Sequence, residues 1–147
     1  TMRAREGEKL KADILGRADT IESLTAKVEQ RSPETVKEYR NRLEVKMQEV
    51  LQNTQIDESR LLTEAAIFAD KVAVDEETVR LHSHLSQLRE LLGKGGAVGR
   101  KLDFLIQEFN REANTIGSKC SDIQIARIVV DIKAEIEKIR EQVQNIE

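Results

Sequence analysis

The sequence is poor in the residues that build sheets, disulfides and membrane spans. It contains no tryptophan, one tyrosine, three phenylalanines and one proline among 147 residues. Because aromatic residues are enriched in strands, this shortage argues against an aromatic-rich β-sandwich or barrel. No run of about 18 apolar residues occurs, so a transmembrane helix is excluded. The single cysteine, Cys120, allows neither an intrachain disulfide nor a cysteine-based zinc site, and a reducing cytosol is therefore the expected compartment.

The residues that are abundant favour helices. Charged residues make up 35% and apolar residues 39% of the chain. Glutamate, lysine, arginine, glutamine, leucine and alanine are abundant, and these residues lose little rotamer freedom in a helix. The net charge is only −3 and the apolar residues are periodic, which disfavours disorder. A pI near 5.6 excludes the coating of nucleic acid by bulk positive charge but leaves room for local basic patches. The opening residues lack the apolar stretch of a secretory signal and resemble the middle of a helix.

The expected fold is all-α, with an antiparallel helical hairpin over residues 1–56 and a helical bundle over residues 57–147. Apolar residues at spacings of three and four predict a first helix that ends near Arg31. Ser32 and Pro33 then predict a restart, because serine caps free amides and proline suits the first turn of a helix. Further helices are expected from Asp57 and from Asp75, and the glycine-rich segment 93–99 is expected to be a bend.

The last helix is expected from about Ser121, after a break at Gly117 and Ser118. Its β-branched stripe is typical of coiled coils with more than two strands, although packing against helices of the same chain explains it equally well. The stripe steps by four and three through Ile125, Val129, Ile132, Ile136, Ile139, Val143 and Ile146.

The glycine-rich segment fits neither a Walker A loop nor a dinucleotide fingerprint. Its glycine spacing differs from both motifs, and no strand precedes it. What remains is a loop carrying Lys94 that leads into a helix with Arg100 and Lys101 in its first turn. Such amides and cations can hold a phosphate. A plain interhelical turn with solvated cations is the alternative.

Two histidines lie on opposite flanks of one predicted helix. At about 100° per residue, His82 and His84 point roughly 200° apart and cannot share a metal within that helix. Glu77, Arg80 and His84 share one flank, where they can bind a metal or a phosphodiester and move a proton. A salt-bridge network at the edge of the core is the alternative interpretation.

The next predicted helix carries two carboxylates one turn apart. Glu108 and Glu112 repel each other mildly unless a cation or an arginine lies between them, and their hard oxygen donors suit magnesium or manganese. On the outer side of this helix Phe104 lies between Arg100 and Arg111. An outward ring in that setting indicates contact with a neighbouring subunit or a nucleotide base, unless another helix of this chain covers it.

Residues 99–119, GRKLDFLIQEFNREANTIGSK, resemble the signature of the bacterial YicC/YloC family. The preceding RLHSHLSQLRELLGKGGAVG and the closing VVDIKAEIEKIREQVQNIE are also similar to the C-terminal region of that family. Full members are longer, so the chain is expected to be the C-terminal half of such a protein. The resemblance implies a cytoplasmic, homo-oligomeric, metal-dependent endoribonuclease that cuts single-stranded or hairpin RNA, with a hexamer as the full-length form.

Combining the resemblance with the spacing gives a concrete hypothesis for the site. We expect catalytic roles for His84, Glu108 and Glu112. A divalent cation, Mn²⁺ or Mg²⁺, is expected on ligands drawn from Glu77, His82, His84, Glu108 and Glu112. RNA contacts are expected from Arg80, Lys94, Arg100, Lys101, Arg111, Asn114 and Lys119. The alternative is a non-catalytic helical module for oligomerisation or RNA clamping, whose active residues lie in the missing N-terminal half.

Overall fold

The computed structural model describes residues 2–52, 55–95 and 99–146, and these residues confirm the all-α class. Five helices follow one another in this part of the chain: α1 (Met2–Leu51), α2 (Glu58–Val72), α3 (Asp75–Lys94), α4 (Gly99–Lys119) and α5 (Ile123–Ile146). The helix expected from Asp57 begins one residue later, and Asp57 caps it, because its side chain accepts a hydrogen bond from the Arg60 amide. No helix in the described ranges is long and apolar enough to cross a membrane.

Helix α1 passes through Pro33 without a turn, so the predicted hairpin within residues 1–56 is wrong. The buried face stays in phase across the proline, since Val28 and Thr35 are both buried and lie seven residues apart. Arg31 also spans the proline, because its guanidinium donates two hydrogen bonds of 2.8 Å to Glu38. The missing amide hydrogen removes one helical hydrogen bond, and these contacts offset the loss.

Replacing Pro33 by alanine is expected to stabilise the protein by about 1 to 2 kcal/mol. Alanine restores the helical hydrogen bond, while the greater freedom of the unfolded chain takes back part of the gain. Urea denaturation followed by circular dichroism measures the change. A neutral or destabilising effect would instead indicate that the proline starts a helix, as the sequence alone predicts.

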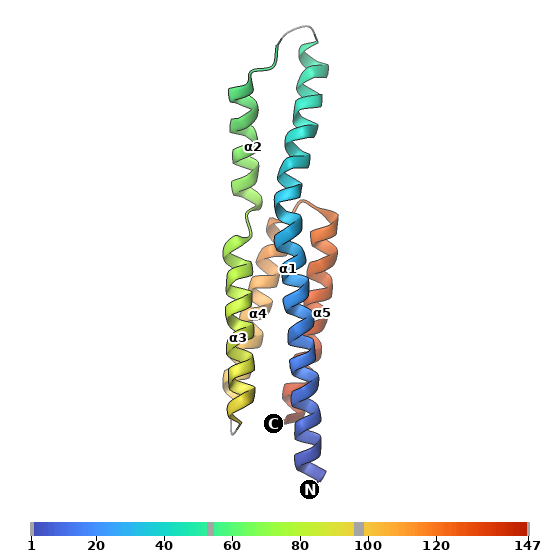
Figure 1. The fold of residues 1–147 in the computed structure, drawn as a ribbon, viewed down its shortest axis with the longest axis vertical. Coiled ribbons are helices and arrows are strands. Elements are labelled where there is room, and N and C mark those ends of the chain that lie inside the picture. Colours follow the sequence, from blue (N-terminus) through green and yellow to red (C-terminus); the bar gives the residue numbers. More distant parts are fainter. Residues whose placement is uncertain (1, 53–54, 96–98, 147) are drawn as a thin grey trace.

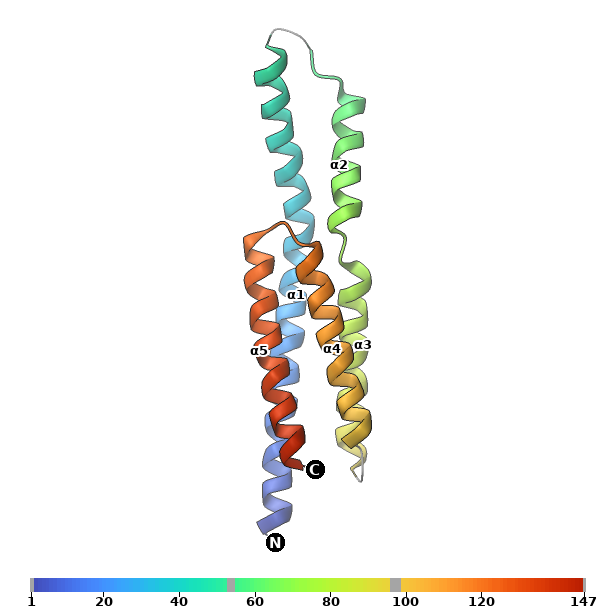
Figure 2. The ribbon, with the colours of Figure 1, turned by 180° about the vertical axis from the view of Figure 1, so that it is seen from behind.

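The antiparallel partner of the upper part of α1 is α2 (Figure 1). Helix α3 continues downward from α2, and α4 and α5 then complete a bundle around the lower part of α1 (Figure 2). In this bundle α1 contacts α3 and α5, and α4 contacts the same two helices, so that neighbouring helices run antiparallel. The domain boundary expected at residue 56 falls between α1 and α2 and stays a prediction.

The bundle core accounts for the β-branched stripe of α5. Ile132, Ile136 and Ile139 are fully buried against the other helices of the same chain. Packing within the chain therefore explains this stripe from Ile125 to Val143, and the structure does not describe the side chain of Ile146. The other helices contribute Ile14, Ala18, Ile21, Val28, Leu81, Leu85, Leu88, Leu92, Leu102, Leu105, Ile106, Phe109, Ala113 and Ile116.

The break predicted at Gly117 and Ser118 does not occur, because α4 continues to Lys119. Gly117 serves close packing instead: a Cβ there would lie 3.3 Å from a methyl group of Val129 in α5. After α4 the chain turns, and Asp122 caps α5 by accepting a hydrogen bond from the Ile125 amide. Asp122 also accepts two hydrogen bonds from Arg31, which ties this turn to α1.

Candidate metal centre

The site residues lie where α3 and α4 face each other in antiparallel register. Lys119 lies opposite Glu77, Arg80 opposite Glu112, and His84 opposite Glu108. The three residues on α3 are each about one helical turn apart, whereas on α4 Lys119 lies about two turns from Glu112 and Glu112 about one turn from Glu108. Because side chains three or four residues apart lie on the same helix face, one flank of each helix supplies all three pairs. The shared flanks predicted from spacing are thus brought together.

His84, Glu108 and Glu112 form one compact group of possible metal ligands. Each offers one ligand atom, and these atoms lie within 4.8 Å of one another. Glu112 is the most enclosed, with 5% of its side chain exposed, against 22% for Glu108. Two carboxylates at this separation repel each other. The Arg80 guanidinium, which donates a hydrogen bond to Glu112, offsets part of this repulsion, and a cation between the carboxylates would relieve it further.

The two ring nitrogens of His84 are buried without a hydrogen-bond partner among the described residues. Both ring nitrogens are shielded from solvent, and Nε2 lies 3.8 Å from an oxygen of Glu108. Its ring meets the fully buried Phe109 edge to face, with centroids 6.2 Å apart. A buried nitrogen without a partner costs free energy, so its position beside two carboxylates fits a cation. One imidazole and two carboxylates suit manganese well and magnesium acceptably.

A second layer of charges holds the carboxylates in place. The Arg80 side chain donates a hydrogen bond of 3.2 Å to Glu112 and also lies 3.8 Å from Glu77. Lys119 donates hydrogen bonds of 2.8 Å to Glu77 and 3.2 Å to the carbonyl oxygen of Ala73. Burial raises the pKa of Glu77, but the Lys119 hydrogen bond, a backbone hydrogen bond and nearby positive charge outweigh it and lower that pKa. Glu77 is therefore ionised at neutral pH.

Two of the predicted metal ligands lie outside this group. The His82 ring nitrogen lies 2.8 Å from Glu29 of α1, on the opposite flank of α3. Because His82 and His84 are two residues apart on α3, their side chains point in nearly opposite directions, and that of His82 faces α1. The prediction that His82 is a metal ligand together with His84, Glu108 and Glu112 is therefore wrong. Glu77 lies close by but is engaged by Lys119, with its second oxygen buried and unpaired within the described ranges.

The predicted RNA-binding residues divide into three sets. Arg80 and Lys119 lie beside the ligand group. Lys94, Arg100 and Lys101 lie at the end of the bundle where α3 and α4 connect. The third set, Arg111 and Asn114, is exposed elsewhere on α4. The phosphate-loop interpretation also involves residues 96–98, which lie outside the described residues.

Sequence reasoning missed that Arg80 and Lys119 are anchored by site carboxylates. It assigned both to RNA, whereas Arg80 contacts Glu112 and Lys119 contacts Glu77. The flank pattern held a partial signal, because Lys119 lies seven residues after Glu112 and so shares its helix face. Pairing across two helices also requires their register, which spacing within one helix does not give.

Fold and site together describe an antiparallel helical bundle protein with a histidine and carboxylate cluster supported by basic side chains. The chain belongs to the YicC-like family, because residues 28–147 match the family model described as "Endoribonuclease YicC-like, C-terminal". The matched region contains α2 to α5 and the part of α1 from Val28 onward.

Two curated relatives are similar to almost the whole chain. A protein of Clostridioides difficile strain 630, named "Probable endoribonuclease YicC", is 50% identical over 147 residues, which cover 99% of this chain and 50% of the relative. A Haemophilus influenzae protein of the same name is 42% identical over 146 residues, with the same coverage of each. The chain thus spans about half the length of the curated relatives it matches.

Proposed function

We propose that this chain is part of a metal-dependent endoribonuclease that cleaves single-stranded or hairpin RNA. The observation that carries the proposal is the group of His84, Glu108 and Glu112, whose ligand atoms lie within 4.8 Å of one another. The names of the two curated relatives support the reaction class. A homo-oligomer in the cytoplasm, hexameric in the full-length form, belongs to the same proposal.

The three side chains act together as the metal ligands, and Arg80 supports one of them. Glu108, Glu112 and the unpaired imidazole of His84 hold the divalent cation, Mn²⁺ or Mg²⁺. When bound, such a cation polarises a phosphoryl oxygen and lowers the pKa of a bound water. Arg80 keeps Glu112 oriented through its hydrogen bond, and a positioned carboxylate binds metal better than a free one.

Basic side chains receive the phosphate. About half of the Arg80 side chain remains exposed, so its guanidinium can meet a phosphate oxygen while its Nε stays bonded to Glu112. Lys119 adds positive charge opposite Glu77, and its hydrogen bond to Glu77 raises its pKa and keeps it protonated. Together these cations offset the charge that develops on the phosphoryl oxygens.

The test combines cleavage with direct metal binding. A labelled RNA hairpin is incubated with the full-length protein in EDTA, in Mn²⁺ and in Mg²⁺, and manganese binding is followed by electron paramagnetic resonance. We expect no cleavage in EDTA, restoration by Mn²⁺ and manganese bound to the protein. Cleavage that persists in EDTA would contradict metal dependence. RNA binding without any cleavage would favour the non-catalytic clamping module instead.

A further inference from the structure

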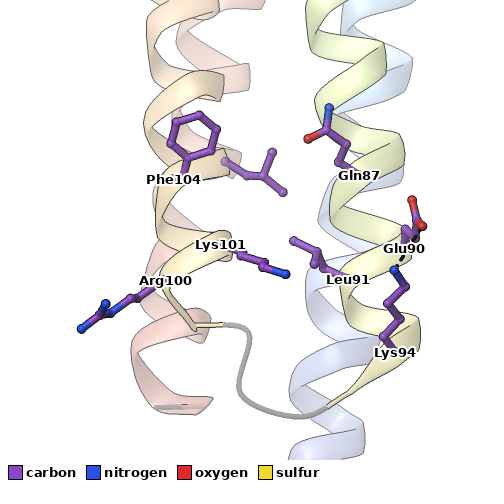
Figure 3. A pocket seen from close by; sticks show the side chains of 8 residues that line it. Gln87, Glu90, Leu91, Lys94, Arg100, Lys101 and Phe104 are labelled. Carbon is purple, nitrogen blue, oxygen red and sulfur yellow. Dashed lines mark ion pairs between the residues drawn. The ribbon is translucent and has the colours of Figure 1, made fainter.

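A cavity of about 360 Å³ lies between α3 and α4, near the end of the bundle where the two helices connect. This volume falls at the lower end of the range for small-molecule sites. Figure 3 shows Phe104 and Lys101 on α4 across from Gln87 and Leu91 on α3. Leu91 and Leu105 give the cavity apolar walls, and Leu105 is almost fully buried. The cavity thus offers apolar walls beside charged side chains.

Phe104 is the aromatic residue that packing within the chain does not explain. Of the four aromatic side chains, Tyr39 and Phe68 stack on each other at 3.9 Å, and Phe109 is fully buried. Phe104, in contrast, is 57% exposed at the cavity. An exposed ring beside a cavity provides a surface on which a flat group can stack.

The charge at the cavity favours an anionic ligand. Glu90, its acidic lining residue, is already paired with Lys94 at 3.4 Å. Lys101 extends toward α3, while Arg100 points away from the cavity on the outer side of α4 (Figure 3). Neither Arg100 nor Lys101 forms an ion pair with another residue in the part of the chain that the structure describes. A planar group attached to a phosphate matches this combination.

The cavity continues the flank that carries the candidate metal centre. Phe104 precedes Glu108 by one turn on α4, and Gln87 follows His84 by about one turn on α3. Four residues of helix span about 6 Å, which is of the order of one nucleotide step in an extended strand. A base in the cavity would therefore lie within about one nucleotide step of Glu108 and His84.

We propose that this cavity binds one unpaired base of an RNA strand, stacked on Phe104, with a neighbouring phosphate against Lys101. The inference deepens the proposed function and rests on it, because the cavity fixes the strand beside the metal centre. Its contribution is substrate positioning, while the reaction depends on His84, Glu108 and Glu112.

Measuring RNA affinity under conditions that prevent metal-dependent cleavage tests the contribution of the cavity separately from the reaction. Anisotropy of a fluorescent single-stranded RNA is measured in EDTA with the full-length protein and its variants. Phe104→Ala is expected to weaken binding about tenfold, Phe104→Tyr to restore it, and Val130→Ala, a control at an exposed site on α5, to leave it unchanged. Lys101→Gln is expected to reduce the slope of log affinity against log salt by about 0.7.

An RNA with a single abasic position tests the stacking itself. Removing the base that occupies the cavity is expected to weaken binding to the unaltered protein about tenfold and to have little further effect on Phe104→Ala. Independent, additive losses at every abasic position would overturn the proposal. Unaltered affinity of Phe104→Ala would also overturn it.

Further outcomes separate this inference from the proposed function. If Phe104→Ala changes the number of subunits in sedimentation experiments and leaves RNA affinity unchanged, the cavity is a protein contact and the inference is wrong. If the unaltered protein cleaves RNA while Phe104→Ala binds it equally well, only the cavity proposal fails. If the unaltered protein neither binds nor cleaves RNA, the proposed function fails and the inference fails with it.

Discussion

Replacing Glu112 by glutamine is expected to reduce RNA cleavage at least about 100-fold. The substitution keeps the shape of the side chain but removes the negative charge of the most enclosed member of the ligand group. The glutamine oxygen can still accept the Arg80 hydrogen bond, so the local fold is retained. Initial rates on a labelled RNA hairpin in Mn²⁺ measure the loss, and circular dichroism checks the fold.

The other two ligands are expected to give losses of similar size. Glu108→Gln and His84→Ala each remove one donor, and their effects are expected to be strongly non-additive with Glu112→Gln because the three act as a unit. The matched control is Glu137→Gln. Glu137 is an exposed carboxylate on α5, away from the site, where it pairs with Arg140. Unchanged cleavage in all three site variants would refute the metal centre.

Replacing Phe109 by alanine is expected to destabilise the protein by about 3 to 5 kcal/mol. The ring lies on α4 and is fully buried in the core of the bundle. Its removal loses the free energy of burying the ring and leaves a cavity that the neighbouring side chains do not fill. Urea denaturation measures the change in the free energy of unfolding. Phe104→Ala is the matched control on the same helix, where an exposed ring should contribute within about 0.5 kcal/mol.

Phe109 also supports the ring of His84, which it meets edge to face. Phe109→Leu is expected to destabilise the protein by less than the alanine variant because it fills more of the space. A destabilisation by Phe109→Ala of under about 1 kcal/mol would contradict the tightly packed core beneath the metal centre.

The sequence predicted the helical class and most buried stripes because these depend on local periodicity. The stripe from Ile125 to Val143 packs as its spacing indicates, and α2 begins next to Asp57, where a helix start is expected. The turn at Pro33 was predicted wrongly, because a local proline signal is outweighed by long-range contacts. The ion pair between Arg31 and Asp122, 91 residues apart, was not predictable from spacing.

Local spacing along each helix also made part of the candidate site predictable. The shared flank of Glu108 and Glu112 follows from their separation by four residues, and the opposite directions of His82 and His84 follow from a separation of two. The meeting of His84 with Glu108 depends on how α3 and α4 are aligned, which is a tertiary property. The cavity beside Phe104 required the same alignment.

The register between α3 and α4 also sets which changes in chain length the site can tolerate. Deleting one residue between Glu77 and His84 would rotate the following part of α3 by about 100° and shift it by about 1.5 Å. His84 would then turn away from Glu108 while Glu77 stayed opposite Lys119, so a single deletion would divide the site. An insertion directly after Gly95 follows the end of α3 at Lys94 and precedes the start of α4 at Gly99, so it adds no rotation within either helix.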